Sequence, residues 1–133
     1  MPGLLVGGKV NLVMGDKLSH RRRSEPISQV EIEWEILRLL EMLENETEAF
    51  EKLAEDAAQK EAEYKAEWAR EYLGAEGSIK EREAWATYKM ASLDHAYKIA
   101  EGLVKAKRER LNSLRTSLDS LRTLAANVRQ QVT

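Results

Sequence analysis

Apolar residues recur at intervals of three and four along most of the chain, and this pattern is most regular in the C-terminal third. The apolar positions there are Leu111, Leu114, Leu118, Leu121, Ala125 and Val128. The spacing places them on one edge of an α-helix, where such a seam is buried against another helix, as in coiled coils. We therefore predict that this seam mediates oligomerisation.

A stripe of arginines accompanies the seam. It consists of Arg108, Arg115, Arg122 and Arg129, which recur every seven residues and so fall on one flank of the same helix. In the hairpin described below, Arg108 and Arg115 are expected to have acidic neighbours. Arg122 and Arg129 extend past the partner helix, which leaves them available to a second subunit or to phosphate.

The first long helix is predicted to begin after Ser28 and to stop at Gly74. Ser28 and Glu31 have the spacing of a capping box, in which a hydroxyl and a carboxylate satisfy free amide groups at a helix start. We expect any break in this helix at residues 45–47. The buried edge of the helix is expected to contain Ile32, Ile36, Leu39, Leu40, Leu43, Phe50, Leu53, Ala57, Tyr64, Trp68 and Tyr72.

A second capping box, Ser78 and Glu81, follows the first helix after a short glycine-containing connection. The second helix is expected to run from Ile79 to about Gln130, with a possible bend at residues 92–94. Its seam extends backwards, with Lys107 as the one interruption, through Val104, Ala100, Tyr97, Leu93 and Met90. The predicted fold is all-α: a long antiparallel helical hairpin with a coiled-coil C-terminal helix, assembling into a homo-oligomer.

The N-terminal stretch differs in composition from the rest. Residues 1–27 are rich in glycine and basic residues, and we expect a flexible basic arm with a short strand at residues 9–14. Residues 28–133 form the predicted hairpin and oligomerisation domain. The basic cluster at residues 20–23 is either a DNA contact or a solvated linker.

Composition and charge narrow the function classes. The chain has 133 residues, of which 33% are charged, and it has no cysteine, so disulfides and thiolate metal sites are excluded. Narrow amphipathic helices of this kind do not suggest an enzyme or a cofactor site, and His20 and His95 are too isolated to suggest metal binding. Residues 31–63 carry three basic and twelve acidic side chains, whereas residues 98–133 carry eight basic and three acidic ones. Either these two segments pair with each other, or the basic segment binds nucleic acid.

Residues 60–74, read as KEAEYKAEWAREYLG and followed by a Gly-Ser turn and a long Leu/Arg-rich helix, resemble the phage UvsY-like family of recombination mediators. The resemblance covers roughly residues 45–130. It implies a ring-like, all-helical homo-oligomer in the cytoplasm of an infected host cell, without enzymatic activity. It further implies binding of single-stranded DNA and of a RecA-type recombinase, which replaces the single-strand-binding protein.

The resemblance places the DNA contacts in the stretch before the turn, at Lys65 and Arg70. Glu67 stands where the family has a second basic residue, which makes the arginine stripe a second candidate. The cations proposed for DNA are Lys65, Arg70, Lys80, Arg82, Arg122 and Arg129.

Aromatic residues accompany the cations around the turn. Trp68 and Trp85 either pack in the core or stack on bases, and Trp34 is read as an interface residue. The alternative function is a coiled-coil scaffold or assembly adaptor without DNA binding.

Overall fold

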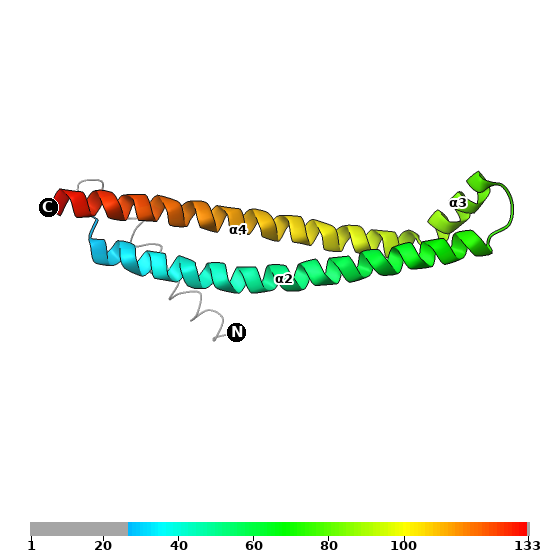
Figure 1. The fold of residues 1–133 in the computed structure, drawn as a ribbon, viewed down its shortest axis with the longest axis horizontal. Coiled ribbons are helices and arrows are strands. Elements are labelled where there is room, and N and C mark those ends of the chain that lie inside the picture. Colours follow the sequence, from blue (N-terminus) through cyan, green and yellow to red (C-terminus); the bar gives the residue numbers. More distant parts are fainter. Residues whose placement is uncertain (1–26, 133) are drawn as a thin grey trace, which may run out of the picture. The chain divides into compact units, whose positions relative to one another are not determined.

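The computed structural model describes residues 27–132, and the expectations for the N-terminal arm lie outside this range. The described part contains three α-helices: α2 (Gln29–Gly74), α3 (Ile79–Lys89) and α4 (Ala91–Val132) (Figure 1). No strand occurs among these residues. The predicted all-α class is therefore confirmed.

Both helix starts show the hydroxyl-to-amide hydrogen bond of the predicted capping boxes. The backbone amide of Glu31 donates to Ser28 Oγ at 3.2 Å, and that of Glu81 donates to Ser78 Oγ at 3.2 Å. Each hydroxyl thus satisfies an amide that has no partner within its own helix. The predicted break at residues 45–47 is wrong, because α2 continues without interruption to Gly74.

The connection between α2 and α3 turns at Gly77 rather than at Gly74. Gly77 has a φ of +110°, which side-chain-bearing residues rarely adopt. A Cβ at this position would also collide with the side chain of Glu81, which folds back over the connection. Gly74 ends α2 as predicted, but Gly77 is the glycine that the turn requires.

The predicted second helix is divided at Met90 into α3 and α4. The bend was expected at residues 92–94, and no proline or glycine marks its true place. Figure 1 shows α3 turned away from the axis of α4. Ala86 of α3 is completely buried, and Trp68 of α2 donates a hydrogen bond to Thr87. Packing of α3 on the end of α2 therefore accompanies the bend.

The chain forms two compact units. In the terminal unit, made by residues up to Glu44 and from Ser113, the first part of α2 lies antiparallel to the last part of α4. Its core is the cluster of Leu39, Leu114 and Leu118. The surrounding apolar residues are Ile36, Met42, Leu43 and Leu121.

The central unit, Asn45–Asn112, contains the rest of α2 and α4 together with α3. Its core is built from the small residues Ala57, Ala100 and Val104, against which Phe50, Leu53 and Ala54 pack. Tyr64 and Tyr97 stack across the two helices, with ring centroids 6.1 Å apart. The buried residues of this cluster are therefore smaller than the leucines of the cluster in the terminal unit.

The predicted seam of α4 is covered within a single chain. Leu111, Leu114, Leu118 and Ala125 are each at most 5% exposed, and Leu121 and Val128 are half-buried. Leu114 and Leu118 pack against Leu39 of α2. These side chains are therefore already removed from water without a second subunit, so their spacing by itself gives no reason for oligomerisation.

Candidate nucleic-acid interface

A group of aromatic side chains in the central unit lies on α3 and on the C-terminal end of α2. Trp68 stacks on Tyr72 with ring centroids 5.4 Å apart and an interplanar angle of 8°. The indole Nε1 of Trp68 donates to Thr87 Oγ1 of α3 at 3.3 Å. Trp68 is half-buried and links the two helices, which is the packing role rather than the base-stacking role considered for it.

Trp85 and Tyr88 of α3 are the exposed aromatics of this region. Trp85 is 44% exposed and Tyr88 is 75% exposed, and their ring centroids lie 6.5 Å apart. Trp85 Nε1 donates to Glu71 Oε2 of α2 at 3.1 Å, which fixes the indole orientation. Lys89 Nζ lies 4.8 Å from the centre of the Trp85 ring. Exposed rings and an ammonium group thus occupy one short helix.

The two cations predicted before the turn do not form one basic face. Lys65 pairs with Glu61 at 2.7 Å and Arg70 pairs with Glu67 at 2.8 Å, both within α2. The hydrogen bond to Glu61 raises the pKa of Lys65, which keeps its ammonium group charged. Positions five residues apart are separated by about 140° around an α-helix, so these two side chains leave α2 on different flanks.

Lys80 and Arg82 lie on α3, near its start. Lys80 is exposed, in the first turn of the helix. Arg82 is half-buried, and its Nε is a buried atom that finds no hydrogen-bond partner among the described residues. Of the six predicted DNA contacts, Lys65, Arg70, Lys80 and Arg82 belong to the central unit, whereas Arg122 and Arg129 belong to the terminal unit.

Two arginines of the stripe, Arg108 and Arg122, have different surroundings from those predicted. The Arg108 guanidinium lies 5.7 Å from the ring centre of Phe50, where an acidic neighbour was expected. Arg122 was expected to lack an intrachain partner, but its Nη1 lies 3.7 Å from Asp119 Oδ1 on the same helix. Arg115 and Arg129 are exposed. Lys107 of α4 does pair with the acidic helix, with its Nζ 2.7 Å from Glu46 Oε2.

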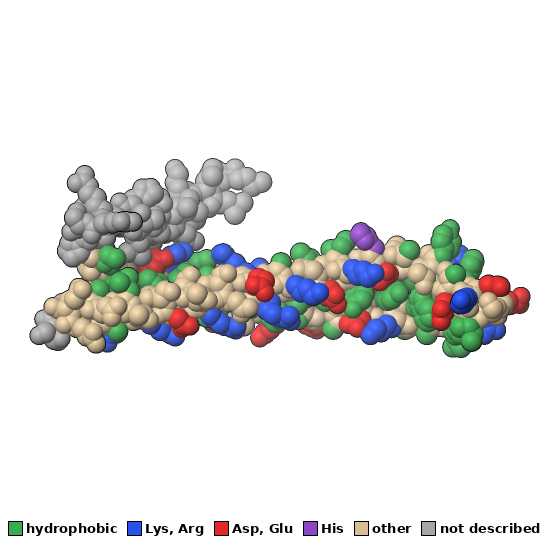
Figure 2. Space-filling view, turned by 90° about the horizontal axis from the view of Figure 1, so that it is seen from above, with side chains coloured by type: hydrophobic (Ala, Val, Ile, Leu, Met, Phe, Trp, Pro, Cys, Tyr) green, Lys and Arg blue, Asp and Glu red, His purple; other side chains and the backbone are tan. Residues whose placement is uncertain are grey.

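On the face shown in Figure 2, basic and acidic side chains are interspersed. Several cations of α2 and α4 form ion pairs one turn along their own helix, including Lys60 with Asp56 and Lys98 with Asp94. The bond to Asp94 raises the pKa of Lys98. Any anion that binds here must compete with these intrachain carboxylates.

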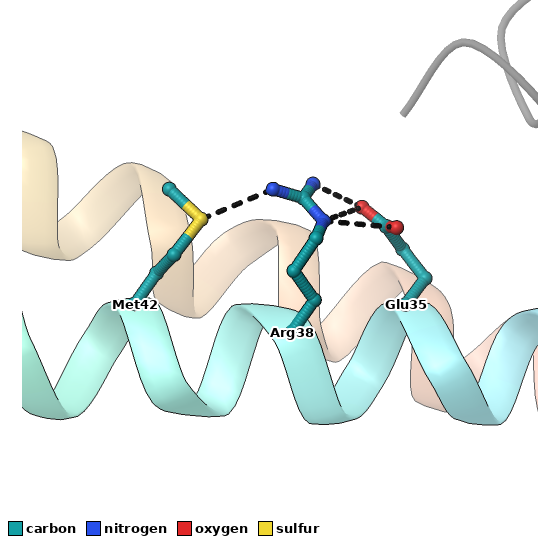
Figure 3. A network of polar contacts seen from close by, with 3 residues as sticks. All are labelled: Glu35, Arg38 and Met42. Carbon is teal, nitrogen blue, oxygen red and sulfur yellow. Dashed lines mark hydrogen bonds and ion pairs between the residues drawn. The ribbon is translucent and has the colours of Figure 1, made fainter. Parts of the chain in front are cut away.

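The sequence pattern did not lead us to expect the buried carboxylate of Glu35 in the terminal unit. Glu35, only 7% exposed, accepts hydrogen bonds from the Arg38 guanidinium, which in turn donates to Met42 Sδ at 3.1 Å (Figure 3). The bond to Glu35 raises the pKa of Arg38. A groove of about 390 Å³ borders this pair and is lined on the α4 side by Thr116, Ser117, Ser120 and Leu121. The three-residue spacing of Glu35 and Arg38 was the available sequence signal.

The described residues contain neither a candidate metal site nor a candidate membrane-spanning helix. Within residues 27–132, no group of three or more His, Cys, Asp or Glu side chains is arranged to hold a metal ion. None of the helices in that range contains a stretch apolar enough to cross a membrane.

Comparison with known proteins adds no relative. The chain matches no protein-family model, no curated protein and no solved structure. The resemblance to UvsY-like mediators therefore remains a prediction from the residues.

Proposed function

We propose that this protein is a non-enzymatic phage recombination mediator that binds single-stranded DNA as an oligomer and helps a RecA-type recombinase replace the single-strand-binding protein. The observation that carries the proposal is the pair of exposed rings, Trp85 and Tyr88, beside Lys89 on α3. Lys80 lies on the same helix.

This combination suits single-stranded DNA for a physical reason. Unpaired bases expose flat faces that stack on aromatic rings without regard to sequence, and ammonium groups neutralise the adjoining phosphates. Tyr88 offers the more exposed ring, and Lys89 places a positive charge over the neighbouring Trp85 ring. The α3 surface supplies both kinds of contact.

Carboxylates near this surface limit the affinity of one chain. Glu71 and Glu81 lie close to Trp85, and Lys65 and Arg70 are paired with glutamates. An exposed ion pair is worth only about 0–1 kcal/mol, so phosphate can displace it. We therefore expect weak binding per chain, multiplied when several chains engage one strand.

The experiment is a fluorescence anisotropy titration of a labelled oligothymidine with the full-length chain, over a series of salt concentrations. Tyr88→Ala is expected to weaken binding about tenfold, since base stacking contributes roughly 1–3 kcal/mol per base. Lys80→Ala with Lys89→Ala is expected to reduce the salt dependence of the affinity, because fewer counterions are released.

Lys52→Ala with Lys105→Ala provides the charge-matched control, because both are exposed cations of the central unit that lie along α2 and α4 away from α3. The affinity of this double variant for DNA should equal that of the wild type. Equal DNA affinity of all variants, or DNA binding that is insensitive to salt, would contradict the proposal that the α3 surface binds DNA. A strand-exchange assay with a RecA-type recombinase and single-strand-binding protein then tests the mediator role.

A second function, an assembly adaptor without DNA binding, is favoured by one observation. Val30, Trp34 and Leu37 form an exposed apolar stripe on α2 in the terminal unit. A stripe of this kind suits a protein partner better than a nucleic acid. If the full-length chain fails to bind oligothymidine at low salt, the adaptor is the better account.

A further inference from the structure

The terminal unit carries an apolar surface that its own core does not use. Val30, Trp34 and Leu37 are 61%, 57% and 61% exposed, and we call these three residues the α2 stripe. Their spacing of four and three places them on one side of α2. Ile32 and Leu39, which are buried, mark the other side of the helix. The first part of α2 therefore has two apolar faces, of which one packs against α4.

The pattern of the α2 stripe indicates a helical partner. A stripe with steps of four and three matches the edge that one helix presents to another. A helix with apolar residues on two sides is normally covered on both. The indole of Trp34 supplies the largest apolar surface, and aromatic residues of this type often anchor protein interfaces.

The charges around the α2 stripe indicate that the partner helix is basic. Residues 29–44 carry five glutamates and one arginine, Arg38. Glu33 lies one turn before Leu37 and Glu41 one turn after it, and both are exposed. Another acidic helix, including α2 of a second copy, would therefore be repelled.

We propose that the α2 stripe binds α4 of the terminal unit in a second copy of this chain, through Arg115 and Arg122. Residues 113–132 of α4 carry three arginines and one aspartate. The Arg115 and Arg122 side chains are exposed and lie on one flank of α4. A guanidinium group stacks on an indole ring and pairs with a carboxylate at the same time, which is the contact that Trp34 and its flanking glutamates offer.

The contact joins different surfaces of the two copies. Each chain gives its α2 stripe to one neighbour and its α4 arginines to another, so the arrangement repeats and closes into a ring when the rotation allows. The existing pair of Arg122 with Asp119, at 3.7 Å and well exposed, is easily exchanged for an intermolecular one. This inference does not depend on DNA binding, which was assigned to the central unit.

The first test measures the mass of the full-length chain by light scattering and sedimentation equilibrium at micromolar to tens of micromolar concentration. The wild type is expected to associate, and Trp34→Glu is expected to be a monomer. Leu73→Glu is the matched control, because Leu73 is 76% exposed on α2 in the central unit. Its mass should equal that of the wild type. Circular dichroism verifies that each variant keeps its helical content.

The second test exchanges the charges. A variant with Arg115→Glu and Arg122→Glu, and another with Glu33→Arg and Glu41→Arg, should each lose association because like charges then face each other. Mixing the two variants should restore association, because opposite charges then meet at every contact between unlike variants. The proposal is overturned by a monomeric wild type, by association that survives Trp34→Glu, or by failure of the mixture to associate. If the wild type is a monomer, the partner that covers the α2 stripe is another segment of the chain or another protein.

Discussion

Lys107 Nζ of α4 lies 2.7 Å from Glu46 Oε2 of α2, so the charged residue that interrupts the apolar seam is neutralised across the two helices. Both side chains are about three-quarters removed from solvent. Arg108, the next residue, contacts the ring of Phe50 instead of a carboxylate. Within the central unit, the pairing of the acidic and basic helices therefore relies on a lysine in the seam rather than on the arginine beside it.

We expect Lys107 and Glu46 to be energetically coupled. Lys107→Met alone should lower the free energy of unfolding by about 1 kcal/mol, since a partly buried carboxylate loses its partner. Lys107→Met combined with Glu46→Leu should recover most of this loss, because an apolar pair carries no desolvation cost. Urea unfolding of the wild type, both single variants and the double variant measures the coupling. Additive effects of the two substitutions would show that the ion pair contributes nothing.

Leu118 should contribute to the stability of the single chain. It is 3% exposed and packs with Leu39 and Leu114, so Leu118→Ala is expected to cost about 2–5 kcal/mol. Leu103→Ala, on the same helix but at a side chain that is 51% exposed, is the control and should cost less than about 1 kcal/mol. Both are measured by urea unfolding. A cost for Leu118→Ala no larger than that of the control would contradict its place in the core.

Two glycines should respond in opposite ways to alanine. Gly77→Ala is expected to destabilise the fold by about 1–2 kcal/mol, because Gly77 has a positive φ and a Cβ would displace Glu81. Gly102→Ala is expected to stabilise it by up to about 1 kcal/mol, since Gly102 lies inside α4 with no atom near the added Cβ. Thermal unfolding compares the two. Similar midpoints for both variants would contradict the strained turn.

The helical class and the main boundaries could be read from the sequence. Capping boxes at Ser28 and Ser78 act over four residues, so the bonds from the backbone amides to the serine hydroxyls are determined locally and appear as predicted. The steps of three and four likewise identified the buried edge, because helix geometry alone decides which residues share a side. Of the predicted edge of α2, Leu40 is an exception and remains 38% exposed.

The candidate site was only partly accessible to this reasoning. The sequence identified the cations and aromatics near the turn, but not which rings are exposed. Trp68 and Trp85 look alike in the sequence, yet Trp68 is half-buried and bonded to Thr87, whereas Trp85 is more exposed and bonded to Glu71. Those differences depend on how α3 packs on α2, which involves residues up to 19 positions apart.

What the sequence determined by itself is local: the capped helix starts after Ser28 and Ser78, the end of α2 at Gly74, and the side chains that share a helix edge. These depend on bonds and spacings within a few residues. The tertiary structure decided what covers each edge. It buried Leu114 and Leu118 against Leu39 within one chain, paired Lys107 with Glu46, and left Trp34 exposed. A periodic apolar pattern predicts that a helix edge is buried. It does not predict which residues cover that edge, because the partner depends on packing between residues far apart in the sequence.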